Sequence, residues 1–292
     1  MLLGSHLSIA GGLHNALEKA HAFGFDCMAM FLRNQMQWRA APLSETAVTV
    51  FRRRREELRI GPIVAHGSYL VNLAGSGDVR RMSIDAMSED LTRCDRLGVE
   101  MLVFHPGANE DADDGIILIA DALDFIVATP RPAGAAGLPP TILLETTAGQ
   151  GYGIGHTFEQ LADIIARLEQ PERVAVCLDT CHVFAAGYDV RTPPAYRKTM
   201  LAFDRTVGMG KLRAIHLNDA RKGLASRVDR HAHIGLGEIT DAGFANFVND
   251  RRLAKVPMIL ETPKELDEHG RDWDIINAER VRSLVKSRKR AK

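Results

Sequence analysis

Residues 141–151 read TILLETTAGQG and residues 174–182 read VAVCLDTCH, and these two stretches decide the fold class. Each begins with residues of high strand propensity and then reaches a carboxylate, Glu145 or Asp179. Short apolar runs of this kind are typical of buried strands. Each run is followed by a longer stretch in which apolar residues recur at helical spacing, and this order predicts strand–helix units around a parallel sheet.

The same unit occurs eight times along the chain. We expect strands at 2–6, 27–32, 63–66, 101–105, 141–145, 174–179, 212–216 and 257–261. The expected helices lie at 13–22, 44–59, 79–97, 115–128, 157–168, 195–207, 241–249 and 273–286. Eight alternations without a break in composition predict one α/β domain, a (β/α)8 TIM barrel over residues 1–285, followed by a basic C-terminal tail at 286–292. The segment TPRPAGAAGLPP (129–140) is expected to be a loop within this domain.

Composition restricts the partners of the protein. The 292 residues include 37 Lys and Arg against 37 Asp and Glu, so no overall basic field attracts a nucleic acid, and any polyanion must be bound locally. Because neither a signal peptide nor a long apolar segment is evident, we expect a cytoplasmic protein without a membrane partner. The four cysteines have no CxxC spacing and are expected to be buried thiols.

At the ends of six of the eight predicted strands we select a side chain as a candidate metal ligand. These residues are His66, His105, Glu145, Asp179, His216 and Glu261. One such residue alone is commonly hydrogen-bonded in the core or solvated. Six of them at the C-terminal mouth of one barrel would repel one another or stay unsatisfied unless cations joined them. The pattern therefore predicts a metal site at the mouth, where barrel enzymes carry their catalytic groups.

Further candidate ligands follow the sixth and seventh strands. His182 lies three residues after Asp179, and Asp229 and His231 alternate in an extended loop. Together they form a mixed nitrogen and oxygen set that suits zinc. His233 shares the alternation and is a rival ligand that we rank below His231.

The motifs that contain these residues, in this order, resemble the endonuclease IV family of abasic-site endonucleases. The resemblance spans the chain through GSHLSIAGGL (4–13), NQMQWRAAPL (34–43), HGSYLVNLA (66–74), FHPGA (104–108), ETTAGQG (145–151), CLDTCHVFAAGYD (177–189), HLNDA (216–220), SRVDRHAHIGLGEI (226–239) and ILETP (259–263). It implies an α/β barrel that carries three Zn²⁺ per chain.

The resemblance also implies a role for each ligand. His66 and His105 would bind one zinc, and Glu145 would bridge it to a second zinc. The second zinc would be completed by Asp179, His216 and Glu261, and the third would be held by His182, Asp229 and His231. The implied reaction is hydrolysis of the phosphodiester 5′ to an abasic site in double-stranded DNA, leaving a 3′ hydroxyl, with removal of blocked 3′ ends. Glu145 and Glu261 would be the catalytic carboxylates, and a hydroxide held by the bridged zincs would be the nucleophile.

Two loops are candidates for contact with DNA. Tyr69 and Leu70 could fill the gap left by a missing base, although such residues also pack back on the barrel rim. A second loop offers Asn34, Gln35, Gln37 and Trp38, with the same alternative. In two places the sequence departs from the family: Met36 replaces an Arg that the resemblance places at the DNA, and Gly67 replaces a frequent Asp.

Two other functions are compatible with the residues alone. A sugar isomerase or epimerase on the related barrel would use two metals and fewer ligands. A non-catalytic protein that binds damaged DNA would bind abasic sites without cutting them. The third ligand set and the candidate wedge residues Tyr69 and Leu70, which could insert where a base is missing, favour the nuclease. We expect this nuclease to act as a monomer at the nucleoid.

Overall fold

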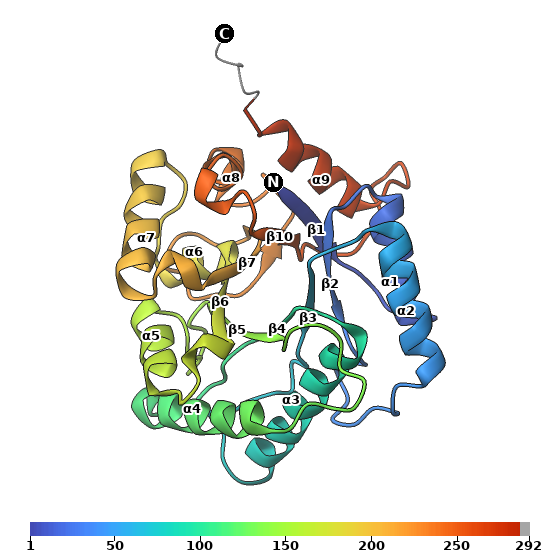
Figure 1. Cartoon of the computed structure of the whole chain (residues 1–292). Helices are drawn as coiled ribbons and strands as arrows, with labels where there is room; N and C mark the ends of the chain where they lie inside the picture. Colours follow the sequence, from blue (N-terminus) through green and yellow to red (C-terminus); the bar gives the residue numbers. More distant parts are fainter. Residues whose placement is uncertain (287–292) are drawn as a thin grey trace.

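Eight parallel strands close into a barrel at the centre of the molecule (Figure 1). This computed structural model describes residues 1–286; of the tail expected at 286–292, all but Lys286 lies outside the described residues. The strands are β1 (Leu2–His6), β2 (Cys27–Phe31), β3 (Ile63–His66), β4 (Met101–Phe104), β5 (Thr141–Glu145), β6 (Val174–Asp179), β7 (Leu212–His216) and β10 (Pro257–Leu260). They pair in chain order, and β10 closes the barrel against β1. The predicted TIM barrel is confirmed.

The eight expected helices surround this barrel (Figure 1). They are α1 (Leu13–Ala22), α2 (Glu45–Leu58), α3 (Gly77–Leu97), α4 (Ala112–Ala128), α5 (Phe158–Arg167), α7 (Pro193–Thr206), α8 (Thr240–Val248) and α9 (Trp273–Ser283). The side chains of Ser44, Thr157 and Thr192 cap the N-termini of α2, α5 and α7 by accepting a backbone N–H. The segment 129–140 is a loop, as expected.

Short elements that we did not expect lie near the C-terminal ends of β6 and β7. Helix α6 (Thr180–Ala186) starts directly after β6, because the Asp179 carboxylate accepts the backbone N–H of His182 at 2.8 Å. Strands β8 (Asp219–Ala220) and β9 (His231–Ala232) form an antiparallel ribbon beyond β7. At the opposite end of the barrel, three 3₁₀ turns within residues 1–286 precede strands: η1 (Pro171–Arg173) precedes β6, η2 (Met209–Lys211) precedes β7 and η3 (Arg251–Leu253) precedes β10.

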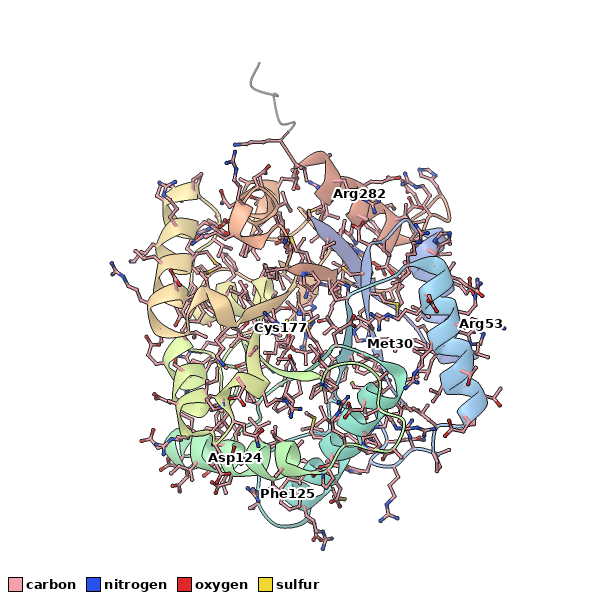
Figure 2. The ribbon with its side chains drawn as sticks, viewed as in Figure 1. Met30, Arg53, Asp124, Phe125, Cys177 and Arg282 are labelled. Atoms are coloured by element: carbon pink, nitrogen blue, oxygen red, sulfur yellow. The ribbon has the colours of Figure 1, made fainter. Side chains whose placement is uncertain are left out.

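The core has two layers. The interior of the barrel is filled by small and branched side chains, including Val64, Leu143, Cys177 and Ala214, while large aromatic residues pack between strands and helices. Figure 2 shows Met30 and Cys177 among the central strands, and Arg53, Asp124 and Phe125 on the outer helices. All four cysteines are free and buried, as expected.

The alternation of each strand places the metal-ligand candidates. Every second side chain of a barrel strand points inward, so the inward residue that follows Val64 is His66 and the one that follows Leu143 is Glu145. The apolar packing of the interior therefore ends in a ring of polar side chains at the mouth. Among residues 1–286, no helix combines the length and apolar character that crossing a bilayer would need.

Candidate metal centre

The ring at the mouth is formed by the last residues of the strands. His66, Glu145, Asp179 and His216 end β3, β5, β6 and β7. His105 and Glu261 come directly after β4 and β10, which end one residue earlier than we expected. Glu145, Asp179 and His216 are fully buried. The nine predicted ligands gather here into three adjoining groups, within each of which the candidate ligand atoms lie within 4.8 Å of one another.

The first group contains His66, His105 and Glu145. The Nε2 atoms of His66 and His105 lie 3.4 Å and 3.2 Å from Oε2 of Glu145. This oxygen is buried and has no hydrogen-bond partner among residues 1–286. Nδ1 of His66 donates to the Gly67 carbonyl at 2.7 Å, so Nε2 is the ring nitrogen that faces Glu145. Two imidazole nitrogens and one unsatisfied carboxylate oxygen thus face a common point, as metal ligands do.

The second group contains Glu145, Asp179, His216 and Glu261. Nδ1 of His216 lies 2.8 Å from Oε1 of Glu145 and 3.0 Å from Oε2 of Glu261. Burial alone would raise the pKa of Glu145 and of Glu261, but the facing imidazoles, above all His216, hold both pKa values well below their usual range. Three carboxylates gathered around one imidazole leave an excess of negative charge, which a divalent cation would balance.

The third group contains His182, Asp229 and His231 and lies toward the outside of the mouth. The Asp229 carboxylate is 3.2 Å from Nε2 of His182 and 3.3 Å from Nε2 of His231. Nδ1 of His182 donates to the Thr146 carbonyl and Nδ1 of His231 to the Glu261 carbonyl, so both Nε2 atoms face Asp229. Burial opposes protonation, but Asp179 and Asp229 raise the pKa of His182 to about 10 and that of His231 to about 9.

Two other side chains near the third group are poorer ligands. Cys181 lies close to Asp179 and His231, but burial raises the pKa of its thiol, which keeps the sulfur protonated. His233 lies apart from the three groups. Its ring stacks on Trp273 at 3.8 Å, and its nitrogens contact Glu265 and Asn277.

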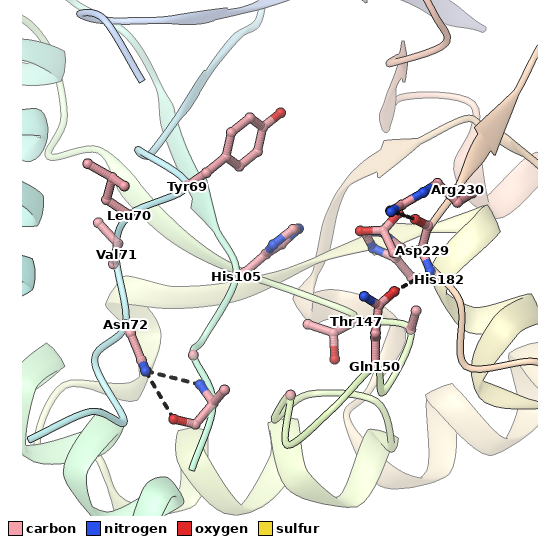
Figure 3. Close-up of a pocket in the computed structure, with 14 residues that line it drawn as sticks. Tyr69, Leu70, Val71, Asn72, His105, Thr147, Gln150, His182, Asp229 and Arg230 are labelled. Carbon is pink, nitrogen blue, oxygen red and sulfur yellow. Dashed lines mark hydrogen bonds and ion pairs between the residues drawn. The ribbon is translucent and has the colours of Figure 1, made fainter. Parts of the chain in front are cut away.

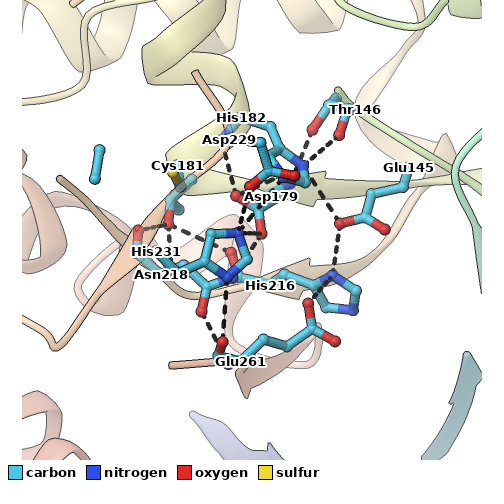
Figure 4. A network of polar contacts seen from close by, with 12 residues as sticks. Glu145, Thr146, Asp179, Cys181, His182, His216, Asn218, Asp229, His231 and Glu261 are labelled. Carbon is cyan, nitrogen blue, oxygen red and sulfur yellow. Dashed lines mark hydrogen bonds and ion pairs between the residues drawn. The ribbon is translucent and has the colours of Figure 1, made fainter. Parts of the chain in front are cut away.

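Three polar residues that the sequence analysis did not select support the ring. Nδ2 of Asn218 donates to Oδ2 of Asp179 at 2.6 Å, and its Oδ1 accepts the backbone N–H of Glu261 at 2.8 Å (Figure 4). Nδ1 of His6 lies 2.8 Å from Oε1 of Glu261. The carboxylate of Asp219 accepts backbone N–H groups from the following loop. For Asn218 and Asp219 the available signal was a polar pair one residue beyond His216 in the HLNDA motif.

A hollow of about 390 Å³ opens beside the metal-ligand candidates (Figure 3). His105, His182 and Asp229 lie on its wall, together with Tyr69 and Leu70. The Tyr69 side chain is exposed, and its ring lies against His66 at a centroid distance of 5.4 Å. Leu70 is half-buried. The first candidate wedge residue is therefore accessible next to the first group of ligands.

The second candidate DNA loop is tied to the first. Asn34 and Gln37 are exposed, whereas Gln35 is half-buried and the half-buried Trp38 packs against the hydrophobic core. Oγ of Ser68 donates to the Gln35 carbonyl at 2.6 Å and accepts the backbone N–H of Leu70. The two loops are therefore linked through one hydroxyl.

Comparison with known proteins assigns the chain to a family. Residues 17–282 match the family model described as a xylose isomerase-like TIM barrel. A probable endonuclease 4 of Geobacter sulfurreducens is 46% identical over 290 residues, which cover 98% of this chain and 95% of the relative. The chain belongs to the endonuclease IV family. The endonuclease IV of Thermus thermophilus, a solved structure, is 37% identical with a TM-score of 0.83, over 97% of this chain and 98% of that one.

Membership of the endonuclease IV family confirms the resemblance found in the sequence. The barrel itself is more widespread. D-psicose 3-epimerase of Clostridium cellulolyticum has a TM-score of 0.68 at 13% identity, over 98% of this chain and 100% of the epimerase. At that identity the likeness shows a shared fold alone.

Proposed function

We propose that this chain is a DNA repair endonuclease that hydrolyses the phosphodiester 5′ to an abasic site, leaves a 3′ hydroxyl and also removes blocked 3′ ends. The observation that carries the proposal is the set of three adjoining ligand groups at the barrel mouth. Family membership supports the same activity, because the relative with 46% identity is named a probable endonuclease 4.

The donor set fits three zinc ions. His66, His105 and Glu145 would hold the first, Glu145 with Asp179, His216 and Glu261 the second, and His182, Asp229 and His231 the third. Imidazole nitrogens and carboxylate oxygens are preferred zinc ligands. The buried Oε2 of Glu145, unpaired within residues 1–286, fits a bridging role. Zinc supplies a lowered pKa for bound water and stabilisation of anionic oxygens.

The residues of the chain orient these groups and supply the local charge. Glu145 is proposed as catalytic because its two oxygens face different ligand groups, and Glu261 because it lies between His6 and His216. Three divalent cations carry six positive charges against the carboxylates of Glu145, Asp179, Asp229 and Glu261, which carry four. With three metals bound, the barrel mouth would carry a net positive charge and would attract phosphate, although the chain as a whole is neutral.

Selection of an abasic site is proposed to depend on the rim. Tyr69 is exposed beside the ligand groups, and Leu70 follows it on the wall of the hollow. Inserting such side chains into a base stack costs least where a base is already missing. Asn34, Gln35, Gln37 and Trp38 are proposed to support this contact from the neighbouring loop, which Ser68 links to it.

The test is a paired measurement of metal content and strand cleavage. The zinc-loaded protein should contain about three zinc ions per chain and should nick a duplex that carries one abasic analogue, leaving a 3′ end that a polymerase extends. The same duplex without the analogue should stay intact. A protein that holds its metals but leaves the abasic duplex uncut would contradict the proposal, and cutting of neither duplex together with turnover of a ketose would favour a sugar epimerase.

A further inference from the structure

We propose that Asp219 is a positioning residue that holds Asp229 and His231 in place, so that its loss empties the third metal site and spares the other two. The inference rests on the proposed function for the number of metals, but its structural part concerns the folding of one segment, residues 219–239. Asp219 is not one of the nine ligand candidates.

The carboxylate of Asp219 is the centre of a cradle of backbone N–H groups. Oδ1 accepts from Ala220 at 2.8 Å and from Ile239 at 2.9 Å, and Oδ2 accepts from Gly235 at 2.9 Å and from Gly237 at 3.0 Å. Asp219 is fully buried and forms no ion pair with another side chain within residues 1–286. Burial raises the pKa of this carboxyl, and the four backbone donors, which come from the two ends of one loop, oppose that rise.

The loop that Asp219 closes carries two of the three outer ligand candidates. Asp219 pairs with Ala232 and Ala220 pairs with His231 in the β8–β9 ribbon. The backbone N–H of Glu238 also donates to the Ala220 carbonyl at 2.9 Å. Asp229 and His231 thus lie in the middle of this segment. The segment leaves the barrel at Asp219, and its other end, at Ile239, is hydrogen-bonded to the Asp219 carboxylate.

The cradle leaves no room for a side chain at Gly237. A Cβ there would lie 2.4 Å from the Ala220 carbonyl oxygen and 2.6 Å from Oδ1 of Asp219. Both contacts are far shorter than real Cβ atoms tolerate, and the first is to backbone. A methyl group at this position would therefore push the cradle open without removing the carboxylate, which provides an independent way to test it.

The other metal-ligand groups are held by different elements. His66, Glu145 and His216 end barrel strands, and His182 is fixed by α6 and the Thr146 carbonyl. Of the three groups, the third alone has two of its members on the segment that Asp219 closes. A defect in the cradle should for this reason act on one site and leave two sites intact.

The experiment compares Asp219→Asn and Gly237→Ala with Asp95→Asn. The amide introduced by Asp219→Asn would turn an NH₂ group toward two of the four N–H donors, whereas Asp95 is a buried carboxylate on α3 that binds Arg131 away from the mouth. We expect both cradle variants to bind about two zinc ions per chain in place of three, with affinity for the third zinc about 10- to 100-fold weaker in chelator competition. The Asp95 variant should keep about three.

Hydrogen exchange of the metal-free proteins gives a readout that needs neither activity nor zinc. We expect faster exchange across 220–239 in the two cradle variants, with unchanged exchange in peptides from β3 and β5. Wild-type exchange in 220–239, or retention of the third zinc, would overturn the inference, as would equal loss of all three metals. If the wild-type protein itself bound fewer than three zincs or failed to cut, the proposed function would fail, while the exchange comparison would still decide the role of Asp219.

Discussion

Oε1 of Glu145 lies 2.8 Å from Nδ1 of His216, while the other oxygen of the same carboxylate faces His66 and His105. Glu145 is the one residue shared by the first and second ligand groups. The strand pairing enforces this position, because Glu145 is the last residue of β5 and its register partner Cys177 lies one layer below the mouth. Under the proposed function, this single side chain determines whether the first and second groups can each hold a metal at the same time.

Replacement of Glu145 should disable both of these sites. In Glu145→Gln the amide keeps the size of the side chain but loses the charge that faces four imidazoles. We expect about one zinc per chain, held by the third group, and incision of an abasic duplex reduced about 100-fold or more. Metal analysis and a nicking assay check both numbers. Glu265→Gln is the matched control, because this exposed carboxylate contacts His233 outside the ligand groups, and its metal content should not change.

The raised pKa values in the third group predict how the stability of the metal-free protein depends on pH. Folding raises the pKa of His182 to about 10 and that of His231 to about 9, above the usual value of 6.5. Protonation of these two histidines therefore stabilises the fold fully below about pH 6.5. This stabilisation is lost as the pH rises through 9 and 10. The melting temperature of the metal-free protein should therefore fall between pH 7 and pH 9.5. The fall should be smaller in a variant in which His182 and His231 are both replaced by Gln, and a fall of equal size there would assign it to other groups.

The loop that carries Asn34 to Trp38 should depend on a buried ion pair. Arg33 binds Asp90 at 2.7 Å in the protein interior and also donates to the carbonyls of Gln37 and Trp38. Asp90→Ala leaves the guanidinium buried without its partner, and we expect the free energy of unfolding to drop by about 3–5 kcal/mol in urea titrations. Asp78→Ala removes an exposed partner of Arg81 on the same helix and should cost at most about 1 kcal/mol. Equal losses in the two variants would be the contrary result.

The sequence predicted the barrel and the gathering of the candidate ligand residues at its mouth, because both follow from periodicity. Val64 and His66 share a face through strand alternation alone, so an imidazole at a strand end could be assigned to the mouth without coordinates. Helix α7 begins two residues earlier than we expected, because Pro193 and Pro194 occupy its first turn, where a missing N–H has no cost. The expectation of which candidate ligands would share a metal came from the family resemblance.

The supporting residues could not be predicted for a physical reason. Asp219 and Asn218 act through backbone groups of segments that are distant in sequence, such as Gly237 and Glu261, and no periodic pattern records such contacts. Helix α6 is too short for apolar spacing to reveal it and depends on the cap from Asp179. Local sequence thus predicted where each strand ends to within one residue, whereas the hydrogen bonds around the candidate ligands depend on the closed barrel.

Tyr69 should contribute to DNA binding through its ring. The side chain is 56% exposed, and its ring makes an edge-on contact with that of Phe31 at a centroid distance of 5.3 Å, so the protein holds the ring in place. We expect Tyr69→Ala to weaken binding of an abasic duplex by about 1–3 kcal/mol, the usual value of one base–aromatic stack, with metal content unchanged. Tyr69→Phe keeps the ring and should bind nearly as the wild type. Equal weakening in both variants would assign the effect to the hydroxyl instead.

Met36 should be a position where a positive charge increases DNA binding. Its side chain is 64% exposed at the tip of a turn that Asn34 closes through its own side chain and carbonyl, so a substitution at position 36 leaves the turn intact. The family resemblance places an Arg here. Met36→Arg should tighten binding at low salt and steepen the dependence of log affinity on log salt by about 0.9, the value of one added phosphate contact. Met36→Gln adds a polar group without charge and should keep the wild-type slope. If Met36→Arg also kept the wild-type slope, this turn would not reach the DNA backbone.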